Sequence, residues 1–360
     1  MRRLPIVITA VLLLCTTLFA SVQSFSKKPV QLAWFYKPPK DGDLDVLASR
    51  FNWFVLTRND EAIRDELKVK GVQGPFLQYL RFDAIEDPGS CTAQPHRNQV
   101  ADEKGDFCQI SKNHPDWFLR NASGKIIRSE GYVMMDPGNK GWQKYWLARA
   151  RQDQQKYGWD GVFLDNVEAS LTKRKQKGEP ANYRTEDSYL AAIEDFLSFI
   201  YKSYFQPNKH PLFANIIAVK DSRPWFDILD YLDGAMVEAF AVDWHDGYRD
   251  SDEWEEQMTL AEKAQGQGKL VILVAQGERN DDRRQQFAFA SYLLVTRGRA
   301  AFRYSRANHY VQTWLYKNYQ LQLGQPLGSR YQKHGTWFRD FEKATVSVNP
   351  SRHTSDIILK

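Results

Sequence analysis

Residues 160–166 read DGVFLDN, and residues 233–240 read DGAMVEAF. Each segment begins with an Asp-Gly pair and continues with a short apolar run, and the runs end in a carboxylate, Asp165 or Glu238. Short runs that are apolar at nearly every position are typical of strands buried on both faces of a parallel sheet. The two segments therefore predict parallel strands that each carry an acidic side chain at the carboxyl end.

Six further apolar or β-branched runs bring the number of predicted strands to eight. They lie at 31–36, 53–58, 74–80, 211–217, 269–276 and 299–305. Segments with helical periodicity separate the strands, most clearly Thr185 to Phe205 and Asp281 to Arg297. Eight strands that alternate with helices predict an α/β fold, the (β/α)8 TIM barrel. An open doubly wound sheet is the alternative, but the first strand leads into FYKPPKDGD (35–43) and not into a glycine-rich phosphate loop.

Two segments fall outside this alternation. Residues 81–140 form a long insertion between the third and fourth strands, which we expect to be a loop excursion over the catalytic face. Residues 334–351 (HGTWFRDFEKATVSVNPS) predict a terminal β-hairpin, with two short strands around Phe341 to Lys343. We expect one domain over residues 25–360.

The first 24 residues have the pattern of a secretory signal peptide: Arg2 and Arg3, an apolar run to about Phe19, then small or polar residues. A single-span anchor is the alternative, but the apolar run is shorter than the roughly 20 residues that a bilayer core requires. Cys15 follows a bulky leucine, which disfavours lipidation. The sequence thus predicts export to the periplasm or the extracellular space, with no stable membrane span after cleavage.

The charge of the chain gives no reason to expect a nucleic acid partner. Removal of Arg2 and Arg3 would lower the formal net charge from +5 to +3, and no basic stripe interleaved with aromatics is present. The run KRKQK at 173–177 is local, and we interpret it as a solvated loop. No cofactor is indicated, and the sequence says nothing of the oligomeric state.

Two cysteines remain after the signal segment, Cys91 and Cys108, both in a polar stretch rich in Pro, Gly and Asp. In an oxidising compartment they are expected to form a disulfide, which would stabilise a short loop by roughly 3 kcal/mol. A metal site is less favoured, because no further sulfur and no nearby pair of His completes a zinc sphere.

The working residues of such barrels stand at the carboxyl ends of the strands, which places Asp165 and Glu238 at the catalytic rim. Asp160 and Asp233 belong to the opposite end and are expected to be turn or cap residues. A structural alternative is that Asp165 and Glu238 pair with arginines such as Arg58 and Arg303 and merely close the barrel mouth.

Two carboxylates on one rim are what glycosidic bond cleavage requires: one acid protonates the leaving oxygen, and one carboxylate attacks the anomeric carbon or activates water. Strands four and six are separated by one strand, so their backbones should stand about 9 to 10 Å apart. Inward-leaning side chains would allow either the retaining or the inverting separation. The spacing does not decide between them.

Other rim side chains suit a sugar, because they combine flat aromatic faces with amide and charged groups. The predicted substrate-binding residues are Trp34, Tyr36, Arg58, Gln78, Asn166, Asn215, Gln276 and Arg303. Tyr79 and Glu278 are weaker candidates. Asp136, in an Asp-Pro-Gly turn before a helical segment, is interpreted as a helix cap in preference to a sugar ligand.

The sequence resembles a bacterial family called hypothetical glycosyl hydrolase-like family 15, which is similar to α-glycosidase-type barrels and unrelated to glucoamylases. The resemblance rests on WDGVFLDN, on the preceding DWFL, MDPGN and YW motifs, and on the closing WFRDFEKATVSVNPS. It implies a (β/α)8 fold with Asp165 as nucleophile, Glu238 as acid/base and net retention. Many relatives carry Asp on strand six, where this chain has Glu238.

Two other functions compete with a metal-independent glycosidase. A metal-dependent hydrolase on this fold would have clustered His ligands, whereas the seven His of this chain are scattered and none ends a predicted strand. A catalytically inactive carbohydrate-binding barrel is the second alternative, because a fold does not fix a function. Carboxylates at both rim positions favour the enzyme.

Overall fold

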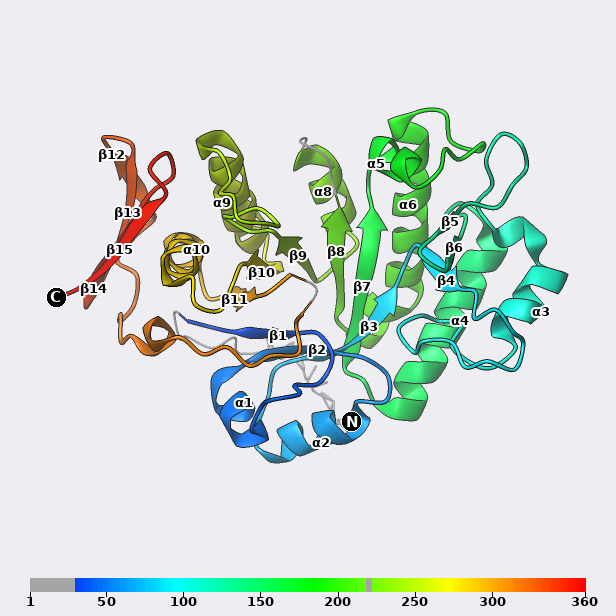
Figure 1. The fold of residues 1–360 in the computed structure, drawn as a ribbon, viewed down its shortest axis with the longest axis horizontal. Helices are drawn as coiled ribbons and strands as arrows, with labels where there is room; N and C mark the ends of the chain where they lie inside the picture. The colour runs from blue at the N-terminus through cyan, green and yellow to red at the C-terminus, as the bar shows by residue number, and fades with distance from the viewer. Residues whose placement is uncertain (1–29, 218–221, 308) are drawn as a thin grey trace, which may run out of the picture.

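The computed structural model describes residues 30–217, 222–307 and 309–360, so the predicted signal peptide lies outside the described residues. Eight parallel strands form one sheet in the order β1-β2-β3-β7-β8-β9-β10-β11 (Figure 1). The predicted strands all form, with the bounds β1 Ala33–Phe35, β2 Trp53–Leu56, β3 Phe76–Arg81, β7 Gly161–Glu168, β8 Leu212–Ile217, β9 Gly234–Glu238, β10 Leu270–Gln276 and β11 Ala300–Ser305.

The first and last strands meet, so the sheet closes into a barrel. Leu32 and Phe302 form a parallel bridge, and the backbone N–H of Phe302 donates to the carbonyl oxygen of Gln31 at 2.9 Å. The prediction of a (β/α)8 barrel is confirmed.

Helices follow the strands around the barrel. Their bounds are α1 Leu44–Arg50, α2 Glu61–Val69, α4 Lys140–Tyr157, α5 Leu171–Gln176, α6 Glu186–Ile200, α8 Ser222–Leu229, α9 Ser251–Gly266 and α10 Asp282–Val295. The two helices expected most clearly from periodicity are α6 and α10. Thr185 caps α6 in a reciprocal capping box with Ser188, and Asp281 caps α10. Beyond α6 the chain continues in a π-helical turn, Tyr201–Phe205, and a last short turn, α7 (Gln206–Asn208).

The two Asp-Gly pairs hold the amino ends of neighbouring strands together. Asp160 Oδ2 accepts a hydrogen bond from the backbone N–H of Phe76 at 2.9 Å, and Asp233 Oδ2 accepts one from Leu212 at 3.0 Å. A Cβ on Gly161 would lie 2.1 Å from the carbonyl oxygen of Pro211, so only glycine fits between the strands. Asp160 and Asp233 were expected to be turn or cap residues; the structure shows them at the amino ends of the strands, as expected, but bonded to the backbone of the neighbouring strand.

The barrel strands alternate between two hydrophobic cores. One set of side chains fills the barrel interior, and its members include Phe35, Leu77, Phe163, Phe213, Met236 and Val274. The intervening residues pack outward against the helices, as Trp34 and Leu164 do. This period of two decides which residues at the strand ends face the hollow of the barrel.

The insertion after β3 is more ordered than the expected loop excursion. It contains a three-stranded antiparallel sheet, in the order β4-β6-β5, and a helix; the bounds are β4 Ala84–Glu86, α3 Asp106–Asn113, η1 Pro115–Trp117, β5 Arg128–Ser129 and β6 Tyr132–Met134. Figure 1 shows it in cyan beside α4, on one flank of the barrel. Arg149 of α4 binds it through Asp102 and Asp106, both at 3.1 Å.

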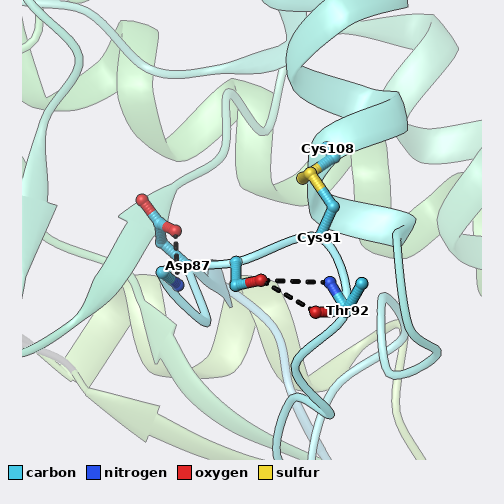
Figure 2. Close-up of a disulfide and its surroundings, with 6 residues drawn as sticks. Asp87, Cys91, Thr92 and Cys108 are labelled. Carbon is cyan, nitrogen blue, oxygen red and sulfur yellow. Dashed lines mark hydrogen bonds between the residues drawn. A yellow bond between two sulfur atoms is a disulfide. The ribbon is translucent and has the colours of Figure 1, made fainter.

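A disulfide joins Cys91, which follows β4, to Cys108 in α3, with an S–S distance of 2.00 Å (Figure 2). Thr92, beside the bridge, donates its backbone N–H to the hydroxyl of Ser90 at 3.3 Å. The predicted disulfide is confirmed.

The C-terminal segment forms four strands and not two. The predicted hairpin is β13 (Thr336–Phe341) with β14 (Ala344–Asn349), and β12 (Tyr331–Lys333) and β15 (Thr354–Leu359) extend it on either side. Figure 1 shows this sheet beside α10, at the opposite end of the molecule from the insertion. Its apolar face joins the same hydrophobic core as α10, because β14 alternates buried Val346 and Val348 with more exposed residues.

Two local predictions were wrong. The run KRKQK belongs to α5, and its Arg174 is only 1% exposed and contacts Asp83 at 3.2 Å, so it is not a solvated loop. Asp136 is not the cap of α4; Asn139 is, since its side chain accepts from the N–H groups of Gly141 and Trp142.

Within the described residues, no helix is long and apolar enough to cross a membrane.

Candidate active site

Asp165 and Glu238 lie on β7 and β9, on either side of β8, and one amide group connects them. Nδ2 of Asn215, on β8, donates to Asp165 Oδ1 at 3.1 Å and to Glu238 Oε2 at 2.7 Å. Because both bonds start from the same nitrogen, their lengths limit the separation of these two oxygens to at most 5.8 Å. The two carboxylates therefore face one small space at the carboxyl ends of the strands.

The second oxygen of Asp165 is held from β3. The hydroxyl of Tyr79 donates to Asp165 Oδ2, and Tyr79 stacks on Tyr36 with ring centroids 4.5 Å apart and planes 15° from parallel. Asn166 adds a longer bond to the same oxygen at 3.3 Å, from a backbone with φ of 58° at an irregularity in the β7–β8 pairing. Aromatic rings thus stand directly beside this carboxylate.

The second oxygen of Glu238 is held by a residue beyond the last barrel strand. The hydroxyl of Tyr310 donates to Glu238 Oε1 at 3.0 Å. Gln276, at the end of β10, donates from its Nε2 to the hydroxyl oxygen of Tyr310 at 3.4 Å. Asn215 and Tyr310 together fix both oxygens of Glu238.

The environment favours the neutral form of Glu238. Burial raises the pKa of its carboxyl from the ordinary 4.5 to about 7, and the negative charge of Asp165 adds to the rise. The hydrogen bonds from Asn215 and Tyr310 act in the opposite direction, because they stabilise the anion. Burial and the charge of Asp165 likewise raise the pKa of Tyr36 to about 12, so this phenol stays protonated.

Six of the ten predicted site residues come together here. They are Tyr36, Asp165, Asn166, Asn215, Glu238 and Gln276.

Trp34 and Gln78 were predicted as substrate-binding residues, but the structure places both on the outer face of the barrel. Trp34 is fully buried, and its Nε1 donates to the carbonyl oxygen of Lys37. Gln78 is also fully buried and donates to Asp153 of α4 at 3.0 Å. Each is adjacent in sequence to a residue that faces the barrel interior, Phe35 or Tyr79, and successive residues of a strand point to opposite faces.

The two arginines predicted as substrate ligands bind other groups. Arg58 forms salt bridges with Asp102 and Glu103 of the insertion. Arg303 is 2% exposed and donates to the carbonyl oxygens of Tyr310 and Gln312. The alternative that these arginines neutralise Asp165 and Glu238 is therefore not what the structure shows. The weaker candidate Glu278 is exposed and pairs with Arg306 at 3.1 Å.

Two tyrosines complete the site. Tyr79 was a weak candidate although it shares a face with the barrel interior, two residues after Leu77. Tyr310 was missed, because it lies in the connection after β11, where strand periodicity says nothing. The aromatic-rich stretch that follows β11, HYVQTWLYKNY (309–319), was the available signal.

In the part of the chain that the structure describes, no three His, Cys, Asp or Glu side chains are grouped as metal ligands. The polar groups gathered around Asp165 and Glu238 are these two carboxylates, three amides and three phenols. Such a set binds hydroxyl groups and moves protons.

A family model described as hypothetical glycosyl hydrolase family 15 matches residues 89–345. No curated protein matches the sequence. Among solved structures, the glycoside hydrolase domain of PelA from Pseudomonas aeruginosa is 18% identical, with 79% of this chain and 97% of that chain covered and a TM-score of 0.52. A maltogenic α-amylase, AmyB from Thermotoga neapolitana, is 11% identical over 89% and 86% of the two chains, with a TM-score of 0.51. At these identities the similarity shows a shared barrel fold.

Proposed function

Since this chain belongs to the hypothetical glycosyl hydrolase family 15, we propose that it hydrolyses glycosidic bonds with Asp165 as nucleophile and Glu238 as general acid/base. Glycosidase activity follows from the family and the barrel fold. The assignment of the two carboxylates, the retention of anomeric configuration and the export of the protein are the further parts of the proposal.

The observation that carries the residue assignment is the amide of Asn215 between the two carboxylates. Retaining glycosidases hold their carboxyl groups about 5 to 5.5 Å apart, whereas inverting enzymes need roughly 6.5 to 9.5 Å to accommodate a water molecule. The limit of 5.8 Å between Asp165 Oδ1 and Glu238 Oε2 favours the retaining arrangement.

The two environments suit different roles. With a pKa of about 7, Glu238 is largely protonated in mildly acidic solution and can donate its proton to the leaving oxygen. Asp165, which accepts hydrogen bonds from Tyr79 and Asn215, attacks the anomeric carbon and forms a glycosyl ester. Glu238, now ionised, then takes a proton from the water that cleaves this ester and is restored to its acid form.

The substrate class is a carbohydrate. The stacked rings of Tyr36 and Tyr79 offer apolar surface beside the nucleophile, and the amides of Asn215 and Asn166 offer oriented polar groups, a combination that suits a sugar ring. Export to the periplasm or the extracellular space is supported by the signal-like pattern at residues 1–24 and by the Cys91–Cys108 disulfide, because such bonds persist in oxidising compartments.

The proposal is tested by screening soluble polysaccharides for released reducing ends, with Asp165→Asn and Glu238→Gln beside the unaltered protein. Both variants should lose turnover, and Asp165→Asn should still bind the polysaccharide that is cleaved. Glu278→Gln is the matched control, since it removes an exposed carboxylate that pairs with Arg306 and should keep full activity.

Retention is read from the anomer that proton NMR detects first in the product. Mass mapping of a trapped 2-fluoroglycosyl adduct should place it on the peptide that contains Asp165. An inverted first product, or an adduct elsewhere, would overturn the assignment. Polysaccharide binding without reducing ends from any substrate would instead support a non-catalytic carbohydrate-binding barrel.

A further inference from the structure

Arg303, in β11, is a buried cation whose partners are backbone carbonyls. Its Nη2 donates to the carbonyl oxygens of Tyr310 at 3.0 Å and Gln312 at 2.8 Å, and its guanidinium lies 4.2 Å from the ring centroid of Trp34. Within the described residues it forms no salt bridge, and its Nε and Nη1 are buried without a hydrogen-bond partner.

Such an arrangement is costly to maintain. Burial lowers the pKa of Arg303 to about 10, which reflects the loss of hydration of the charge. A neutral apolar side chain would fill the space against Trp34 and Phe51 without that loss. The two carbonyl contacts are therefore the feature that an arginine supplies here and a hydrophobic residue does not.

The carbonyls that Arg303 binds belong to the segment that carries Tyr310. The same segment is attached to the chain beyond β1, because Lys40 donates its N–H to the carbonyl oxygen of Val311 at 3.0 Å. The N–H of Thr313 donates to Asp41 Oδ1 at 2.8 Å. Immediately before these attachments, the Tyr310 side chain reaches the barrel interior, where its hydroxyl lies 3.0 Å from Glu238 Oε1.

We propose that Arg303 is a positioning residue that fixes the main chain at 310–312, so that the Tyr310 hydroxyl is held against the acid/base Glu238. The inference rests on the proposed function for the role of Glu238 and adds a residue that touches neither the carboxylates nor the hollow between them. Arg303 acts through Tyr310, and the protonation of Glu238 is the property that this chain of contacts controls.

The hydrogen bond from Tyr310 determines the direction in which the pKa of Glu238 changes. A hydroxyl that donates to a carboxylate stabilises the anion, so the loss of the Tyr310 bond raises the pKa of Glu238. The other titratable groups with an electrostatic influence on or from Glu238 are Asp165 on β7, Tyr36 after β1 and Tyr310 itself. Asp165 and Tyr36 are unchanged in the variants below.

The test follows the Glu238 carboxyl by carbon NMR in protein labelled with ¹³C at the glutamate carboxyl, with Glu238→Gln to assign the signal. Tyr310→Phe should raise the midpoint of the Glu238 titration by about one pH unit, the effect of one hydrogen bond to a charged group. Arg303→Met should raise it in the same direction. The double variant should match Tyr310→Phe alone, because Arg303 acts only through that hydroxyl.

Two variants separate positioning from general destabilisation. Arg339→Met removes another buried arginine that donates to backbone carbonyls, those of Leu293, Leu294 and Thr296, and should leave the Glu238 midpoint unchanged. Arg303→Lys keeps a donor and the charge and should restore much of the original midpoint.

An unchanged midpoint in folded Arg303→Met, with a raised one in Tyr310→Phe, would overturn the inference. So would an Arg303→Met effect that adds fully to that of Tyr310→Phe. These readings need no substrate. If the titrations behave as expected while Glu238→Gln retains glycosidase turnover, the proposed function fails and the positioning role of Arg303 stands.

Discussion

The hydroxyl of Tyr79 donates a hydrogen bond to Oδ2 of Asp165. The bond crosses from β3 to β7, whose register pairs Tyr79 with Phe163, two residues before the carboxylate. Asp165 therefore has one oxygen directed by Tyr79 and the other by Asn215, and the side chain cannot rotate without losing a partner. In its proposed role as nucleophile, a carboxylate held in this way is oriented before the substrate arrives.

Tyr79→Phe should lower kcat about tenfold or more while the protein stays folded, because the variant removes a hydrogen bond to a charged group and keeps the ring. Steady-state kinetics on the cleaved polysaccharide measure the effect. Tyr331→Phe is the control, since it removes a hydroxyl that donates to a carboxylate, Asp340 Oδ2 at 2.9 Å, in the terminal sheet. Equal kcat values for Tyr79→Phe and the unaltered enzyme would mean that the bond does not orient the nucleophile.

The activity should fall as the pH rises past about 7. As the proposed general acid, Glu238 must be protonated to assist the leaving group, and burial together with the charge of Asp165 raises its pKa to about 7. A pH–rate profile of kcat/KM should show this basic limb. A substrate with a leaving group that needs no proton should flatten it. If the loss of activity at high pH persists unchanged with such a substrate, the group that titrates is not Glu238.

Glu238→Gln should make the protein more stable at alkaline pH. The unfolded chain releases the Glu238 proton near 4.5 and the folded protein near 7, so the favourable contribution of this group is complete below about 4.5 and is lost as the pH rises to about 7. The difference corresponds to about 3 kcal/mol of unfolding free energy. Urea unfolding should find the variant more stable at pH 8 and equal to the original at pH 4; equal stability at both would contradict the burial argument.

Replacement of Cys91 and Cys108 by serine should lower the unfolding free energy by about 3 kcal/mol, because the disulfide closes a loop between residues 17 apart in sequence. The bridge lies in the insertion, whereas the hydrogen-bond partners of the two carboxylates lie on or after barrel strands, so kcat should hardly change. Thermal unfolding with and without a reductant measures the effect, and the double serine variant should not respond to the reductant. A variant at Thr92, which neighbours the bridge in Figure 2, should respond as the original does.

The sequence was sufficient for the eight barrel strands, for the two neighbouring carboxylates Asp165 and Glu238 at the rim and for the disulfide, because each depends on a local pattern. At the rim, the period of two within each strand decides which side chains face the barrel interior. Asp165, Asn215 and Glu238 each follow an interior residue by two positions, namely Phe163, Phe213 and Met236. By the same rule Tyr79, and not Gln78, faces the barrel interior, whereas Trp34 faces the helices outside the barrel.

Other features could not be read in this way. Tyr310 reaches Glu238 from a connection whose path is fixed by Arg303 and by the chain after β1, far away in the sequence. Arg58 forms a salt bridge with Asp102 of the insertion and does not contact the carboxylates at the rim. The two residues are far apart in the sequence, so no local pattern predicts their contact. The outer strand β15 of the terminal sheet packs beside α10, and the exposed outer strand β12 is paired with β13; hydrophobic periodicity encodes neither relationship.

Among the described residues, β1 and β11 close the barrel through one bridge, Leu32 with Phe302, whereas the other neighbouring strands share ladders of three residues or more. This seam carries Tyr36 on one side and Arg303 on the other. On warming, separation of the two edges would disorganise the surroundings of both Tyr36 and Arg303 while most of the barrel remained intact. Heat inactivation should thus precede melting, and a staple across the seam would extend the working temperature more than reinforcement anywhere else on the wall.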